Sequence, residues 1–122
     1  MMTPREAVEK MKQAHANAYQ LAKEKYVPYW LNELNKSIMI AANNGRGMTR
    51  LELRWAERLG ANNCPDIQTK KYTERLLDEE LNKSGYRIVK LSPIEADIPK
   101  YEIWWFVDAY DMFKEVSANG SC

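Results

Sequence analysis

The hydrophobic positions of this chain change their spacing several times, and each spacing predicts an element. From Pro4 to about Lys25, apolar residues recur every three or four positions, which is typical of one face of a helix. Thr3 fits the N-cap, Pro4 fits the first helical position, and Glu6 completes a capping box. The apolar face is narrow and consists of Ala7, Met11, Ala14, Ala18 and Leu21. Its small side chains predict close packing against another helix.

Pro28 interrupts this pattern, because the residue before a proline is disfavoured in helical geometry. We therefore expect a break between Tyr26 and Pro28 and a second helix that starts at Pro28 or Tyr29. One apolar side of this helix is formed by Leu31, Leu34, Ile38, Ala41 and Ala42. The helix should end before Gly45, which suits a left-handed C-cap.

The segment from Met48 to Asn63 fits two periods. A period of two separates an apolar from a charged face, with Leu51, Leu53 and Trp55 opposite Arg50, Glu52 and Arg54. A period of 3.6 gives a capping box at Thr49 and Glu52, a face of Leu51, Trp55 and Leu59, and a helix end at Gly60. We favour a strand through about Trp55, followed by a loop over residues 61–66.

The next pattern predicts a helix followed by a hairpin. A helix from Pro65 to Ser84 would bury Tyr72, Leu76, Leu77 and Leu81. Gly85 and Tyr86 stand at the C′ and C″ positions of a Schellman motif. Residues 86–91 and 101–107 are rich in β-branched and aromatic side chains, so we expect two antiparallel strands joined by the proline-containing loop 92–100.

These elements indicate one α+β domain over residues 1–122, with a small, mainly antiparallel sheet of about three strands packed by helices. Its parts are an N-terminal helical pair (1–45), an α/β core (46–107), and a short helix from about Asp108 to Val116 with a terminal tail (108–122).

Composition narrows the class of protein. Apolar residues make up 45% and charged residues 29% of the chain, as in ordinary soluble domains. The longest apolar runs are five residues, and the N-terminus has no apolar signal region, so we expect a cytoplasmic protein without a membrane span. Cys64 and Cys122 are expected to be free thiols.

The net charge of +1 argues against a nucleic-acid binder that relies on bulk charge. The charges are nevertheless separated along the chain. Residues 36–71 carry seven basic and three acidic side chains, whereas residues 78–115 carry nine acidic and five basic ones. We expect a dipolar molecule with a positive and a negative region.

The order of the elements resembles that of small bacteriophage-encoded accessory proteins. These combine a helix-glycine-strand unit with a helix-Gly-Tyr-strand hairpin that ends in an Ile-x-Trp strand. The matching positions, between residues 38 and 107, are Ile38, Ala41, Ala42, Gly45, Leu77, Leu81, Gly85, Tyr86, Ile103 and Trp105. All are structural positions, so the resemblance implies an architecture and a phage origin, in an infected bacterial host, and carries over no active site.

Six basic residues form the first candidate site: Arg46, Arg50, Arg54, Arg58, Lys70 and Lys71. On a helix, three of the arginines would form one ridge suited to phosphates. On a strand, Arg50 and Arg54 would share a face with Glu52 between them. Two interpretations stay open, namely a solvated surface and a site for anions, nucleotides or nucleic acid.

The strand near the C-terminus is the second candidate, because it carries large apolar side chains on both faces. Tyr101, Ile103, Trp105 and Val107 can form the core face. Trp104 and Phe106 lie on the other face, which we expect to be covered by the N-terminal helices, by a second copy of the chain or by a partner.

Other chemistry is sparse. His15 is the only histidine and is interpreted as structural, and no residues have the spacing of a metal site, so we expect no metal or cofactor. Tyr26, Tyr29 and Trp30 are interpreted as a plug between the helices, with a stacking surface for a base as the alternative.

The sequence therefore suggests a non-enzymatic protein that binds its target stoichiometrically. If the phage resemblance holds, the target is a host protein or a defence component that is thereby inhibited, and Trp104 and Phe106 or the acidic C-terminal half are the contact surface. A homodimer is a further possibility. The alternative is a nucleic-acid-binding or nucleotide-sequestering protein that uses the arginines with aromatic stacking.

Overall fold

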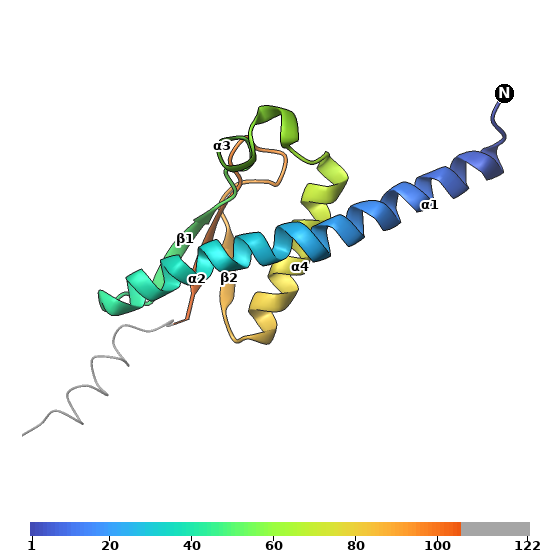
Figure 1. Ribbon diagram of the computed structural model, residues 1–122. Helices are drawn as coiled ribbons and strands as arrows, with labels where there is room; N and C mark the ends of the chain where they lie inside the picture. Colours follow the sequence, from blue (N-terminus) through green and yellow to red (C-terminus); the bar gives the residue numbers. More distant parts are fainter. Residues whose placement is uncertain (106–122) are drawn as a thin grey trace, which may run out of the picture.

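The computed structural model describes residues 1–105, which form helices packed on a small sheet (Figure 1). The elements in chain order are α1 (Pro4–Leu21), the π turn η1 (Ala22–Tyr26), α2 (Val27–Asn43), β1 (Met48–Glu52), α3 (Trp55–Leu59), the 3₁₀ turn η2 (Ala61–Asn63), α4 (Ile67–Lys83), β2 (Arg87–Lys90) and β3 (Lys100–Trp104). The α+β class is confirmed, and the sheet has the three antiparallel strands that were expected. The helix expected over residues 108–116 lies outside the described residues.

The predicted break at Pro28 is wrong, because α1, η1 and α2 form one uninterrupted helix (Figure 1). A proline inside a helix lacks an N–H donor, and its ring collides with the carbonyl four residues earlier. Here the turn before Pro28 is widened, and the Val27 N–H donates to the Ala22 carbonyl five residues back. A π turn of this kind absorbs the proline without ending the helix.

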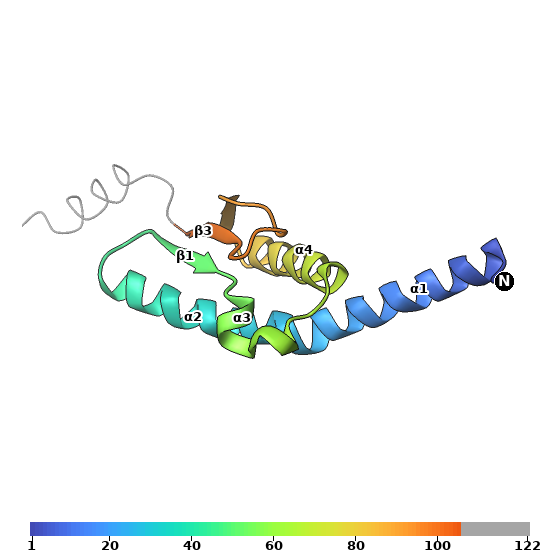
Figure 2. The same ribbon diagram turned by 90° about the horizontal axis from the view of Figure 1, so that it is seen from above.

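The predicted alanine face is only partly buried. The Thr3 hydroxyl accepts a hydrogen bond from the Glu6 N–H at 3.2 Å, which confirms the N-cap. Residues 1–14 are all exposed, and the helix projects beyond the rest of the fold at this end (Figures 1 and 2). Ala18 and Ala22 are buried, whereas Leu21 is exposed. The contact with α4 therefore begins one turn after Met11, near His15.

Two glycines end helices in the way that the sequence predicts. The Tyr86 N–H donates to the Leu81 carbonyl at 2.9 Å and the Gly85 N–H to the Asn82 carbonyl at 3.1 Å, which is the Schellman pattern. Gly85 has φ +89° and Gly45 has φ +76°, a region that favours glycine. Both helix ends are thus fixed by glycine.

The ambiguous segment contains both of the elements that were considered. Residues Met48–Glu52 form β1, as favoured, but the strand stops before Trp55, where the short helix α3 begins and runs to Gly60. The inward positions are confirmed, since Leu51, Leu53 and Trp55 are all buried.

Helix α4 begins two residues later than Pro65, because Asp66 is its N-cap. The Asp66 carboxylate accepts from the Thr69 N–H at 2.9 Å and from the Thr69 hydroxyl at 2.7 Å. These hydrogen bonds lower the pKa of Asp66. On the buried side of α4, Leu77 and Leu81 are confirmed as core residues, whereas Tyr72 and Leu76 are only partly buried.

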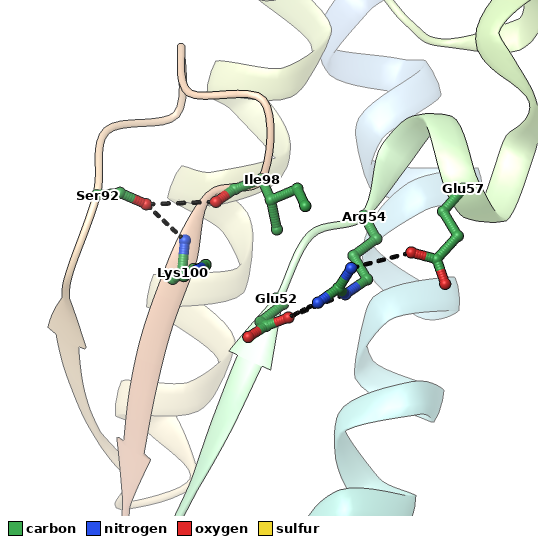
Figure 3. A network of polar contacts seen from close by, with 6 residues as sticks. All are labelled: Glu52, Arg54, Glu57, Ser92, Ile98 and Lys100. Carbon is green, nitrogen blue, oxygen red and sulfur yellow. Dashed lines mark hydrogen bonds and ion pairs between the residues drawn. The ribbon is translucent and has the colours of Figure 1, made fainter.

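The sheet has the order β1-β3-β2, and both pairings are antiparallel. Ile103 lies opposite Thr49 on one side and opposite Ile88 on the other. The predicted hairpin of β2 and β3 is confirmed. The Ser92 hydroxyl accepts a hydrogen bond from the Lys100 N–H at 2.8 Å and closes the loop between the two strands (Figure 3).

The hydrophobic core lies between the sheet and the helices. Tyr101 and Ile103 of β3 belong to the same buried cluster as side chains from α2, α3 and α4, among them Trp30, Leu34, Trp55, Leu77 and Leu81. Tyr101 also donates its hydroxyl to Glu74 of α4, which in turn pairs with Lys90 at 3.2 Å. Burial raises the pKa of the Tyr101 hydroxyl, with Glu74 adding to the shift, so the hydroxyl stays protonated and keeps donating.

Candidate binding surface

The helices cover only one face of the sheet, and the opposite face is the candidate binding surface. Tyr101 and Ile103 point toward the helices, so the alternation of a strand turns Glu102 and Trp104 to the other side. Figure 2 shows the long helix and α4 on the same side of β1 and β3. We call the opposite side the outer face. By the strand register it carries Met48, Arg50, Glu52, Arg87, Val89, Lys100, Glu102 and Trp104.

Trp104 is the largest side chain on the outer face and lines a hollow of about 210 Å³ with Arg87, Val89 and Glu102. Its indole Nε1 donates to the Glu102 carboxylate at 3.4 Å, which helps to orient the ring over β3. Trp104 is partly buried, whereas Val89 is 37% exposed and Leu91, just beyond β2, is 45% exposed. An aromatic ring, aliphatic groups and an arginine thus meet at one concave spot.

The N-terminal helices do not cover the Trp104 face, so that part of the prediction is wrong. They pack on the side of the sheet that contains Leu51 and Ile103. The predicted core face is confirmed at Tyr101 and Ile103, and Trp105 is partly buried with its ring 6.3 Å from that of Tyr86. Phe106 and Val107 lie outside the described residues.

The arginine series does not form a single ridge. Arg50 lies on β1, Arg54 between β1 and α3, and Arg58 on α3. Arg54 contacts the carboxylates of Glu52 at 2.5 Å and Glu57 at 3.1 Å (Figure 3). Hydrogen bonds to Glu52 and then to Glu57 raise its pKa, so it remains charged, but its charge is matched locally.

The remaining basic candidates have separate neighbours. Arg58 lies 3.7 Å from Glu33 of α2, and the Lys71 ammonium lies 3.8 Å from Glu95. Lys70 stacks over the Trp55 ring at 5.9 Å from its centroid. Within residues 1–105, Arg46 and Arg50 have no carboxylate within ion-pair distance.

The aromatic cluster around Pro28 belongs to the core. Tyr26 and Trp30 are 5% and 2% exposed, and each ring meets Trp55 edge to face with centroids 5.3 Å apart. Tyr29 is partly buried beside Trp30. Because two of the three rings are buried, the alternative of a stacking surface for a base is wrong. No break exists for them to plug, and they instead fix α3 on the long helix.

His15 has a structural contact, as predicted. Its Nδ1 is 2.9 Å from the Tyr72 hydroxyl, and this contact joins α1 to α4 together with the ring of Tyr19. Cys64 is free. Within the part of the chain that the structure describes, no group of three acidic, histidine or cysteine side chains could hold a metal ion, and no helix is long and apolar enough to cross a membrane.

Two residues of the outer face were not identified from the sequence as candidate site residues. Arg87 and Val89 belong to the Trp104 hollow only because β2 pairs with β3 in this register. Alternation along residues 86–91 could have placed both side chains on one face, but it could not place that face beside Trp104.

The chain matches no protein-family model, and neither a curated protein nor a solved structure matches it.

Proposed function

We propose that this protein is a non-enzymatic binding protein that captures a protein partner, one to one, on the outer face of its sheet. The observation that carries the proposal is a sheet with a helix-covered inner face and an outer face centred on Trp104. The resemblance to small phage accessory proteins suggests a partner from a bacterial host, such as a protein of its defence machinery, which capture would inhibit.

The composition of the outer face supports a protein partner. Trp and Arg are enriched among the residues that dominate binding energy at protein interfaces, and they act best in concave, desolvated spots. Trp104 and Arg87 line such a hollow, and Val89 and Leu91 add apolar area beside it. Glu102, which also lines this hollow, would supply an acceptor and thus specificity.

Capture from a bacterial lysate tests the proposal. The full chain is attached through its N-terminus, which lies at the far end of the long helix from the sheet (Figure 1). We expect a protein to be retained in stoichiometric amounts, equally with and without nuclease. Trp104→Ala should reduce retention at least tenfold, whereas Met39→Ala, which removes an apolar side chain that is 58% exposed on α2, should not.

Two results would contradict the proposal. Retention that disappears after nuclease treatment would favour the nucleic-acid alternative. Retention that survives Trp104→Ala while the variant keeps its helical signal would remove the outer face as the contact surface.

A further inference from the structure

β1 is an edge strand, and its free side borders helix α2. Among the described residues only β3 pairs with β1. The Leu53 N–H donates to the Pro99 carbonyl at 2.9 Å, so odd-numbered residues of this segment direct their backbone groups toward β3. Because these groups alternate along an antiparallel strand, the N–H and C=O of Met48 and Arg50 point away from β3.

A hollow of about 220 Å³ lies between this edge and α2. The polar and aromatic side chains that line it are Trp30, Glu33, Ser37, Arg50, Glu52, Arg54 and Arg58. Figure 3 shows Arg54 in the space between β1 and the pale cyan helix α2. A groove between an edge strand and a helix offers backbone groups on one wall and side-chain contacts on the other, which is how strand-adding peptides are bound.

The donors of this groove outnumber its free acceptors. Glu52 is engaged by Arg54 at 2.5 Å, and Glu33 lies 3.7 Å from Arg58. Arg50 has no ion pair within residues 1–105, and the edge N–H groups of Met48 and Arg50 do not pair with β3. A ligand that fits must therefore bring acceptors, and a carboxylate is the side chain that best matches a free guanidinium.

We propose that the free edge of β1 binds an extended acidic peptide segment as a fourth strand, with an Asp or Glu of the peptide paired to Arg50. A polyphosphate chain fits less well, because Glu33, Glu52 and Glu57 surround the arginines and repel successive phosphates. This site lies along the edge of β1 and shares no lining residue with the Trp104 hollow, although the Arg50 side chain is on the outer face, and it goes beyond the function proposed above.

The test is a selection of random nine-residue peptides displayed for binding to the full chain. We expect enrichment of sequences that alternate β-branched residues with polar ones and contain at least one Asp or Glu. Each selected peptide is then synthesised in two versions, one as selected and one with its Asp or Glu replaced by Lys. The affinity of each version for the full chain is measured by fluorescence anisotropy. The Lys versions should bind at least tenfold more weakly.

Four variants locate the binding. Met48→Pro removes an edge donor at the first residue of a strand, where proline is tolerated, and should weaken binding at least tenfold. Arg50→Ala should do the same. Met48→Ala keeps the N–H, and Trp104→Ala alters the Trp104 hollow, which shares no lining residue with the groove. Both variants should bind the peptides with affinities within twofold of the wild type, so this proposal and the proposed function can fail separately.

Several outcomes would overturn the proposal. These are a selection without enrichment, enriched peptides that lack acidic residues, and binding that survives Met48→Pro. A wild-type dimer that Met48→Pro dissociates would show that a second copy occupies the edge instead. If Met48→Pro loses its circular dichroism signal, Arg50→Glu decides, because it must reverse the preference from the acidic peptides to their Lys versions.

Discussion

The two faces of the sheet differ in how deeply their side chains are buried. On the inner face Tyr101 and Ile103 are 3% and 0% exposed and pack against three helices. On the outer face their neighbours Glu102 and Trp104 are only partly buried and line an open hollow. The outer face of β3 combines the aromatic Trp104 with the charged Lys100 and Glu102, so a large aromatic side chain on this strand does not by itself mark the core. The difference comes from which side the helices occupy.

The largest effect is expected on the inner face. Ile103→Ala removes a fully buried side chain at the centre of the sheet and leaves a cavity. We expect a loss of about 2 to 5 kcal/mol in the free energy of unfolding. Urea denaturation followed by circular dichroism measures it, with Val89→Ala on the outer face as the matched control. A loss below about 1 kcal/mol would mean that Ile103 is not a core residue.

A smaller loss of stability is expected at Gly85, in the turn that connects α4 to β2. Gly85→Val places a β-branched residue at φ +89°, which costs about 1 to 2 kcal/mol in a left-handed conformation. No atom lies within 4 Å of the added Cβ, so the cost is conformational and not steric. Gly85→Asn should be milder, since asparagine tolerates this region. Equal melting temperatures for wild type and Gly85→Val would contradict the Schellman assignment.

The N-cap of α4 should stabilise the fold in a pH-dependent way. At neutral pH, Asp66→Ala should lower the free energy of unfolding by about 1 kcal/mol. Because the pKa of Asp66 is lowered in the fold, its contribution is complete above its usual value of 3.8 and is lost as the pH falls through the folded value.

Asp66→Asn keeps an acceptor but does not titrate, so it serves as the control. The melting temperature of the wild type should exceed that of Asp66→Ala by less at pH 3 than at pH 7. The difference in melting temperature between Asp66→Asn and Asp66→Ala should be the same at both pH values. A difference that grows at low pH would exclude the N-cap interaction as its source.

Much of the fold follows from local chemistry in the sequence. The caps at Thr3 and Gly85, the hairpin of β2 and β3, and the inward positions of β1 depend on residues close together in the chain, and all are confirmed. The prediction at Pro28 was wrong because a general preference was treated as a rule. A single widened turn satisfies the backbone there, and nothing in the local sequence distinguishes it from a break.

The candidate surfaces were less predictable, because they depend on tertiary arrangement. Trp104 was identified from its chemistry, but the side of the sheet that the long helix covers is decided by packing across the molecule. The arginines were identified individually, whereas their carboxylate partners come partly from α2, as Glu33 does. The edge of β1 became visible only once the strand order was known.

The most direct test of the account is the free energy of unfolding of Trp104→Ala compared with that of Trp55→Ala, measured by urea denaturation followed by circular dichroism. Trp55 is 1% exposed, and its truncation should cost about 3 to 5 kcal/mol. If the outer face is a surface for a partner, Trp104→Ala should cost less than half as much and should leave the molecular mass unchanged. An equal loss for the two variants would show that Trp104 is a core residue and would contradict the division of the sheet into a core face and a binding face.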